Sequence, residues 1–236
     1  MSCKYFILCK SNDVCINDDN ENQVISINSK NYLLPKSNIN YYIENGLFEK
    51  NLIEWSKILC NKDKNMLDIG AHTGTYTVSL AKYCNHVYAF EPQKMTYYAL
   101  CGSVALSNLT NVTCLNFGLG STEQEGIQTL NIISLDGGGS TLHKENNYIL
   151  NTEEIEIKTL DSYNFVNIGF IKIDVENNEL QVLKSSINTL KNSNYPKILF
   201  EMNEYNSELI EFLISLKYYI TNLINCSNMY LASIKE

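Results

Sequence analysis

The stretch MLDIGAHTGTY, residues 66–76, combines residue types that can hold a small polar ligand. An apolar run meets Asp68, and Gly70 and Gly74 follow it. A glycine lets the chain turn sharply beneath a ligand, and the start of a following helix presents backbone N–H groups. Glu91 ends the next strand-like run, at the distance of about 20 residues where an acid accepts hydrogen bonds from ribose hydroxyls. A ligand with a ribose, an ammonium and a carboxylate suits this set, and S-adenosylmethionine has all three.

Two other nucleotide-binding patterns do not fit this stretch. A dinucleotide loop needs the glycines of G-x-G-x-x-G, because the second glycine lets the backbone approach the pyrophosphate. His72 stands at that second position and carries an imidazole instead. A Walker loop is excluded as well, because no Gly-Lys-Ser/Thr follows.

A third acid, Asp174, is the first candidate for a catalytic base or an orienting acid. In KIDVE, residues 172–176, charged residues alternate with apolar ones, as they do in a strand whose two faces differ. Asp174 ends this strand, and open α/β sheets bind ligands at the carboxyl ends of their strands. Lys172 either faces the cleft or forms a structural ion pair beneath it. Glu176 and Glu179 either join the site or serve as acids in the first turn of the next helix.

His143 is a second candidate for the base. It follows the glycine-rich run GGGST, which we expect near the mouth of the cleft. A neutral imidazole in that place can take a hydroxyl proton. The alternative is an exposed loop histidine with no role.

Strand-like and helix-like runs alternate after residue 65, which favours parallel βαβ units. The expected strands cover residues 65–70, 86–92, 112–120, 126–134, 154–160, 169–176 and 197–204, followed by a strand pair within 217–236. The expected helices cover residues 73–84, 95–108, 178–192 and 207–217. Before them we expect a hairpin made of residues 4–10 and 23–34, then one or two helices broken near Gly46. The predicted organisation is a cap over residues 1–49 and an α/β domain over residues 50–236.

Composition limits the partners of this chain. The net charge is −8, and Lys is the only strongly basic residue type. Phosphate-binding surfaces normally use Arg forks and a positive patch, so a nucleic acid partner is not expected. No run approaches the roughly 18 apolar residues of a membrane span, and the N-terminal apolar patch is too short for a secretory signal. The eight cysteines are scattered without a Cys-x-x-Cys pair, which favours a reduced, cytoplasmic protein.

Several motifs, taken in order, resemble the FkbM-type family of S-adenosylmethionine-dependent methyltransferases. They are MLDIGAHTGTYTVSLAK, VYAFEP, NVTCLNFGLGS, TLDSY, FIKIDVENNELQVLKSS and KILFEMN, spread over residues 47–204. The resemblance implies a class I methyltransferase fold, Rossmann-like, with a seven-stranded, mostly parallel sheet and a C-terminal antiparallel hairpin. It also implies O-methylation, often of a sugar or polyketide hydroxyl.

The resemblance assigns further residues to the cofactor. Asp68, Gly70, Ala71 and Gly74 would line the methionine end, and Glu91 would hold the ribose. It would place Asn116 and Phe117 beside the adenine, and Asp174 and Glu176 at the centre of methyl transfer. Asp174, Glu201 and Asn203 have oxygen atoms that suit Mg²⁺, but the resemblance does not require a metal and none is predicted.

Two residues depart from the family pattern. His72 stands where the family usually has Asn. Both side chains can bind the cofactor carboxylate, and the alternative is a helix-start residue that faces solvent. Asn177 replaces a glycine, and Asn is the next best residue for a left-handed backbone.

The acceptor expected from these features is a sugar or another small molecule with a hydroxyl group. Tyr41, Tyr42 and Tyr76 either form an aromatic wall for a sugar ring or simply pack. Two rival functions stay open: an RNA 2′-O-ribose methyltransferase, and a non-catalytic protein that binds S-adenosylmethionine. The oligomeric state is also open, with a homodimer as one option.

Overall fold

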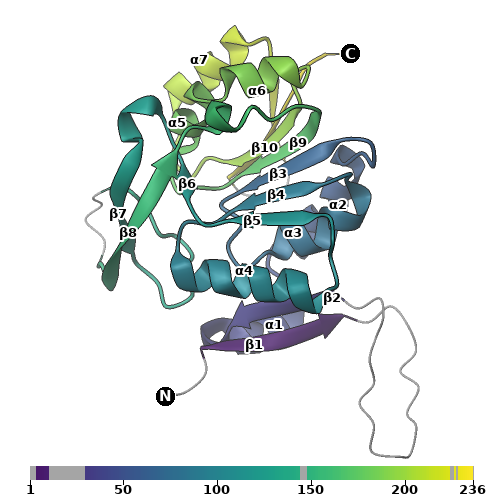
Figure 1. The fold of residues 1–236 in the computed structure, drawn as a ribbon, viewed down its shortest axis with the longest axis vertical. Coiled ribbons are helices and arrows are strands. Elements are labelled where there is room, and N and C mark those ends of the chain that lie inside the picture. Colours follow the sequence, from purple (N-terminus) through teal and green to yellow (C-terminus); the bar gives the residue numbers. More distant parts are fainter. Residues whose placement is uncertain (1–3, 11–29, 144–147, 224–225, 227, 236) are drawn as a thin grey trace, which may run out of the picture.

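A seven-stranded sheet forms the centre of the computed structural model, which describes residues 4–10, 30–143, 148–223, 226 and 228–235. The strand order is β11-β12-β10-β9-β3-β4-β5 (Figure 1). β12 runs antiparallel to both of its neighbours, and the other pairings are parallel. The predicted fold class, including the C-terminal antiparallel hairpin, is confirmed. The strands are β3 (Asn65–Ile69), β4 (Val87–Phe90), β5 (Val112–Leu115), β9 (Ile168–Ile173), β10 (Lys197–Glu201), β11 (Tyr219–Asn222) and β12 (Met229–Ser233).

Helices cover both faces of this sheet, because its central strands bury both sets of alternating side chains. Met66 of β3 packs toward α3 (Thr75–Leu80) and α4 (Lys94–Leu106). Leu67 and Ile69 pack on the opposite face, toward α5 (Glu179–Lys184), α6 (Ile187–Asn192) and α7 (Ser207–Ser215). Asp68 therefore shares the face of Met66, and its register partner on β9 is Lys172. The strand pattern thus places a buried acid beside a buried base.

The N-terminal segment packs on the α3 and α4 side. β1 (Tyr5–Lys10) and β2 (Lys30–Pro35) pair antiparallel, as predicted, and residues 23–29 of the second expected strand lie outside the described residues. Gly46 separates α1 (Ile39–Asn45) from α2 (Lys50–Ser56), which confirms the expected break. Tyr32 and Leu34 are fully buried in the same core cluster as Met66. The N-terminal segment and the β/α units therefore share one core.

One predicted strand, residues 112–120, is wrong as a single element. It divides into β5 of the central sheet and β6 (Gly118–Leu119), which pairs with β8 (Asn151–Lys158). The division occurs at Asn116, whose side-chain amide donates to the carbonyls of Glu91 and Pro92 at 2.9 and 3.0 Å. β7 (Gly126–Ile132) completes a separate three-stranded sheet, on the left of Figure 1.

One predicted helix, residues 178–192, is two helices, α5 and α6. The hydroxyls of Ser185 and Ser186 donate back to carbonyls of the preceding turn, at 2.9 and 2.7 Å. Asp161, distant in sequence, accepts the backbone N–H groups of Asn188 and Thr189 at 2.9 and 2.8 Å. A serine pair that bonds to the backbone can interrupt a helix, and an acid at a helix start stabilises a new one.

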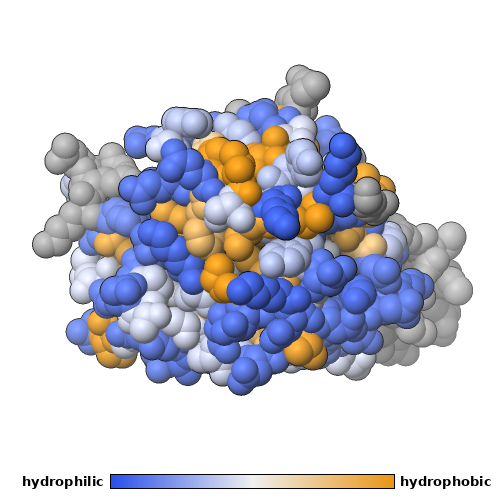
Figure 2. All heavy atoms as spheres, turned by 90° about the horizontal axis from the view of Figure 1, so that it is seen from above, coloured by the Kyte–Doolittle hydropathy of each residue, from blue (hydrophilic) through white to orange (hydrophobic). Residues whose placement is uncertain are grey.

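Apolar side chains are exposed on the side of the molecule shown in Figure 2, where hydrophilic residues surround them. A separate apolar groove is lined by residues in or near α7, β11 and β12, and it shares no residue with the cavity described below. Among the described residues, no helix is both long and apolar enough to cross a membrane.

Candidate active site

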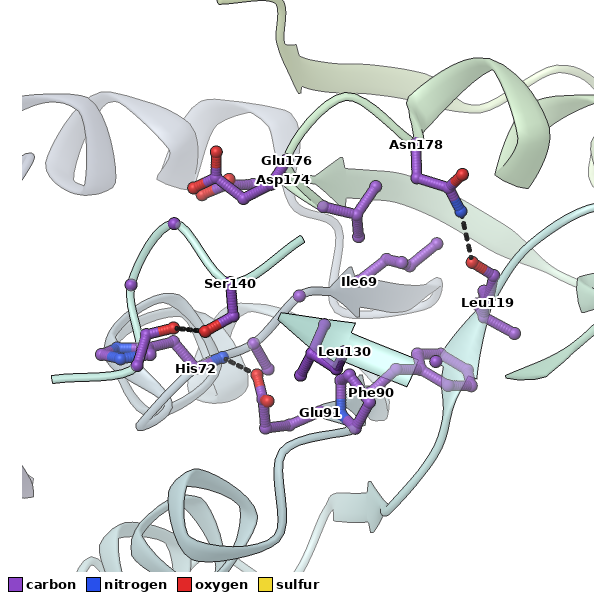
Figure 3. Close-up of a pocket in the computed structure, with 18 of the residues that line it drawn as sticks. Ile69, His72, Phe90, Glu91, Leu119, Leu130, Ser140, Asp174, Glu176 and Asn178 are labelled. Carbon is purple, nitrogen blue, oxygen red and sulfur yellow. Dashed lines mark hydrogen bonds between the residues drawn. The ribbon is translucent and has the colours of Figure 1, made fainter. Parts of the chain in front are cut away.

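A cavity of about 270 Å³ lies at the carboxyl ends of β3, β4 and β9 (Figure 3). Open α/β sheets hold their ligands at this edge. Most sequence-predicted residues lie on its wall, together with Tyr42, Phe48 and Glu49 from the N-terminal segment. The predicted residues on the wall are Gly70, Ala71, His72, Glu91, Phe117, Asp174 and Glu176.

The turn after β3 needs glycine at its first position. Gly70 has a φ of 77°, and a Cβ atom there would lie 1.8 Å from the carbonyl oxygen of Asp174. The backbone N–H groups of Gly70 and Ala71 both donate to the carbonyl of Phe90, at 3.1 and 2.9 Å. Gly74 also has a positive φ. It is the N-cap residue before α3 and packs against Leu100, although it is not on the cavity wall. The turn is therefore hydrogen-bonded to β4 and packed closely against the residue that follows β9.

Glu91 lies at the end of β4 and is buried. Its Oε2 accepts the backbone N–H of His72 at 2.9 Å, and its Oε1 accepts that of Gln93 at 2.8 Å. Burial raises the pKa of Glu91 to about 7, and the two N–H groups oppose this rise. A carboxylate oxygen has room for more than one hydrogen bond, so Glu91 keeps acceptor positions for a ligand.

Lys172 links three parts of the site from below. Its Nζ donates to the carbonyl of Gly70 at 2.9 Å and to Oδ2 of Asp174 at 3.1 Å, and it lies 4.0 Å from Oδ1 of Asp68. Burial lowers the pKa of Lys172, but the neighbouring carboxylates outweigh burial and raise it. Lys172 therefore stays charged, and both sequence-based readings of it hold, since it forms the ion pair and also touches the cavity.

Asp68 lies beneath the cavity and is not on its wall. Thr77 donates its hydroxyl to Oδ2, whereas Oδ1 has no hydrogen-bond partner among the described residues. Burial raises the pKa of Asp68, and the charge of Lys172 opposes this rise. The direct contact with a ligand that the family resemblance implies for Asp68 stays a prediction.

Three carboxylates gather where β9 and β10 end. Oxygen atoms of Asp174, Glu176 and Glu201 all lie within 4.8 Å of one another. Burial and the charges of the other two acids raise the pKa of Glu201 to about 8. Asn203 donates its side-chain N–H to Oε2 of Glu201 at 2.8 Å, so its amide presents a hydrogen-bond donor to this group of acids. Figure 3 shows Asp174 and Glu176 side by side, across the cavity from Glu91.

Positive φ values shape the loop that carries these acids. Glu176 has a φ of 52° and Asn177 has a φ of 72°, so Asn177 adopts the left-handed backbone predicted for it. Glu179 begins α5, and its Oε1 accepts the backbone N–H of Val175 at 3.1 Å. Glu179 therefore acts as the helix-start acid that was one of its two predicted roles.

His72 holds a loop over the cavity. Its Nε2 lies 2.7 Å from the carbonyl oxygen of Asp136, and because a carbonyl only accepts, this nitrogen donates. Burial lowers the pKa of His72, which favours the neutral ring. Asn38 of the N-terminal segment donates to the Asp136 side chain. The imidazole thus fastens the glycine-rich loop, which neither sequence-based reading of His72 anticipated.

Two further predicted residues, besides Asp68 and Gly74, lie away from the cavity wall. Asn116 is exposed and its amide holds the backbone of Glu91 and Pro92, whereas Phe117 beside it is buried and reaches the wall. His143 is exposed, and its Nε2 lies 3.2 Å from the carbonyl oxygen of Asn177. It lines a neighbouring pocket that does not contain Asp174. Its role as a base finds no support in this geometry.

Glu49 is a cavity residue that sequence reasoning missed. It precedes α2 with a φ of 52° and makes no side-chain capping bond to that helix. Instead its Oε2 accepts the hydroxyl of Tyr76 at 3.0 Å. The residue is exposed as a whole, yet loss of hydration around its carboxylate raises its pKa. No local pattern marks this position, because its partners come from α3 and β9.

The family model described as Methyltransferase FkbM domain matches residues 68–220, more than half of the chain. The chain belongs to the FkbM methyltransferase family. No curated protein matches the sequence. The predicted family is therefore confirmed by a match that begins at Asp68 and includes most of the cavity wall.

Solved structures share the fold of this FkbM-family chain. Methyltransferase FkbM from Methylobacillus flagellatus is 18% identical, with a TM-score of 0.52, over 73% of this chain and 44% of that chain. Precorrin-6y C5,15-methyltransferase from Geobacter metallireducens is 13% identical, with a TM-score of 0.50, over 79% of this chain and 88% of that chain. The present chain thus spans less than half of the Methylobacillus protein.

Proposed function

We propose that this FkbM-family methyltransferase uses S-adenosylmethionine to methylate a sugar hydroxyl, on a glycan or an activated sugar. The observation that carries the proposal is one cavity with Glu91 on one side and Asp174 on the other. The first acid suits ribose hydroxyls and the second suits an acceptor hydroxyl. Their positions at the ends of β4 and β9 match the expected edge of the sheet.

The chemistry of the wall fits the cofactor. Beyond Glu91, apolar residues surround the space beside Phe117, and they include Leu119, Ile155 and Ile157. A flat adenine base suits such a wall, whereas an ammonium suits the part of the cavity nearest the buried Asp68. Oδ1 of Asp68 accepts no hydrogen bond from the described residues, and the ammonium of Lys172 lies 4.0 Å from it. When bound, the cofactor supplies a methyl group that its positively charged sulfur already activates.

The side chains of this chain would orient the acceptor and take its proton. Asp174 is the proposed base, because it is partly open to the cavity and Lys172 keeps a positive charge 3.1 Å from its Oδ2. The hydrogen bond from Lys172 also orients the carboxylate of Asp174. Alignment of reactants supplies about 7–11 kcal/mol in favourable cases, and a general base adds roughly 10²–10⁴ in rate.

Substitution of the two acids separates cofactor binding from chemistry. Glu91→Ala should weaken S-adenosylmethionine binding by about 1.5–3 kcal/mol, the range for a hydrogen bond to a charged group. Asp174→Asn should bind the cofactor nearly as well as the wild type, but turn over about 100-fold more slowly. Calorimetry and a mass-spectrometric methylation assay measure the two effects. Normal turnover by Asp174→Asn would exclude Asp174 as the base.

The two rival functions predict different outcomes in the same assays. An RNA methyltransferase would bind RNA with a steep salt dependence, which a chain of net charge −8 without Arg disfavours. A non-catalytic protein would bind S-adenosylmethionine without transferring methyl to any acceptor. Either result would contradict the proposed sugar methylation.

A further inference from the structure

The acceptor end of the cavity contains an aromatic platform built by the N-terminal segment, outside the region that matches the family. Phe48 lines the cavity and is 40% exposed. Tyr41 stacks against it with ring centroids 4.1 Å apart and an angle of 16° between the planes. Tyr42 meets Phe48 edge-on at 5.0 Å. Two neighbours thus brace the ring of Phe48, while part of its surface stays accessible.

Contacts through Glu49 place this platform at the Asp174 end of the cavity. Glu49 follows Phe48 directly and accepts the hydroxyl of Tyr76. Lys172 lies 5.3 Å from the centre of the Tyr76 ring, and the same Nζ binds Asp174. Phe48 and Asp174 are therefore joined by a short chain of contacts.

The backbone at Glu49 has a conformation that favours glycine or asparagine. Its φ is 52°, and its side chain does not stabilise the helix that it begins. Strained positions of this kind tend to occur at functional sites, where other contacts hold them. Here the side chain instead places a carboxylate beside the platform, as an acceptor for ligand hydroxyls.

Charge restricts what can lie on this platform. Among the described residues of the cavity wall, Lys172 is the one side chain with a permanent positive charge, and two carboxylates already neighbour it. Glu49, Asp174 and Glu176 lie on the same wall. A phosphate group near these carboxylates would be repelled by their negative charges, with few cationic side chains to offset the repulsion, so its binding is disfavoured. A neutral ring with hydroxyl groups meets no such penalty.

We propose that Phe48 is the platform on which the acceptor's sugar ring stacks, and that this ring is an uncharged pyranose without a phosphate group. This inference rests on the proposed sugar methylation and narrows it to glycosides and glycan ends, away from nucleotide sugars. The C–H groups on one face of a pyranose are weakly positive and apolar, so they suit the negative face of an aromatic ring. Glu49 accepts hydrogen bonds from the ring's hydroxyls.

The test compares Phe48→Leu, which keeps apolar volume, with Phe48→Trp, which keeps an aromatic face. The probes are methyl pyranosides of common neutral sugars and the matching nucleoside diphosphate sugars. Each is titrated by saturation-transfer NMR into protein loaded with S-adenosylhomocysteine, and KM is measured by methyl transfer. Phe48→Leu should weaken pyranoside binding roughly 5- to 10-fold, the scale of a lost aromatic contact. Phe48→Trp should stay within about threefold of the wild type, and S-adenosylhomocysteine affinity should be unchanged in both.

The outcomes distinguish a failure of this inference from a failure of the proposed sugar methylation on which it rests. Methylation of a pyranoside with the same KM in wild type and Phe48→Leu would refute the platform and leave sugar methylation intact. Tighter binding of the nucleotide sugar than of the methyl pyranoside would refute the charge argument. Absence of methyl transfer to every sugar by the wild type would refute the proposed function itself, and the inference with it.

Discussion

Replacing Lys172 by Met should destabilise this protein more than any surface lysine substitution. The Nζ atom of Lys172 is 3.1 Å from Asp174 and 4.0 Å from Asp68, and the side chain is 4% exposed. Met fills similar space but removes the charge, so Asp68 becomes an uncompensated buried acid. Breaking a buried ion pair in this way costs about 3–5 kcal/mol. For a chain of this size that loss lowers Tm by roughly 6–20 °C.

Denaturant unfolding of two further variants isolates the cause. Lys184→Met removes an amine that lies 4.0 Å from Glu208 at the surface, and should cost less than about 1 kcal/mol. The double variant Lys172→Met with Asp68→Asn should recover part of the lost stability, because asparagine leaves no buried charge without a partner. A cost below about 1 kcal/mol for Lys172→Met, or no recovery in the double variant, would refute the ion-pair reasoning.

Three other predictions follow from backbone clashes, buried acids and helix ends. In denaturant unfolding, Gly70→Ala should lower the free energy of unfolding by about 1–3 kcal/mol more than Gly126→Ala does. Both glycines have a positive φ, but only a Cβ atom at position 70 clashes with another residue. Equal losses would contradict the clash. Without ligand, stability should fall as pH rises from about 4.5 through 7, since burial raises the pKa of Glu91 to about 7 and the folded state keeps a proton that the unfolded state releases. Glu91→Gln should reduce that fall in the free energy of unfolding by on the order of 3 kcal/mol between pH 4 and 8, measured in thermal or denaturant scans. An unchanged pH profile would show that another group titrates. Asp161→Ala should cost about 1 kcal/mol of unfolding free energy by removing the cap of α6, and Asp161→Asn should cost less.

The arrangement of the central sheet was predictable because its signals are local. Alternation along KIDVE and the apolar run before Asp68 set which side chains each strand buries. Parallel strands bring their carboxyl ends to one edge, so Glu91 and Asp174 reach one cavity whatever the details of the loops. Gly70 was predictable as well, since a sharp turn after a buried strand favours glycine.

Contacts between distant segments decided the rest. The serine pair within residues 178–192 interrupts a helix whose second half then needs Asp161 as a cap, and Asp161 lies outside that segment. Within residues 112–120 the chain leaves the central sheet after Leu115, because β8 offers β6 a new partner.

The same distinction explains the site contacts that sequence reasoning did not anticipate. Asp68, expected at the methionine end of the cofactor, lies on the strand face that meets Thr77 of α3 and Lys172. His72 binds the carbonyl of a loop more than sixty positions away in the chain. Glu49 and Phe48 line the cavity because the N-terminal segment is packed into the shared core through Tyr32 and Leu34. The sequence by itself thus determined at which edge of the sheet the cavity lies, because strand periodicity is local. Tertiary packing decided which side chains complete that edge, because their partners lie far apart in the chain.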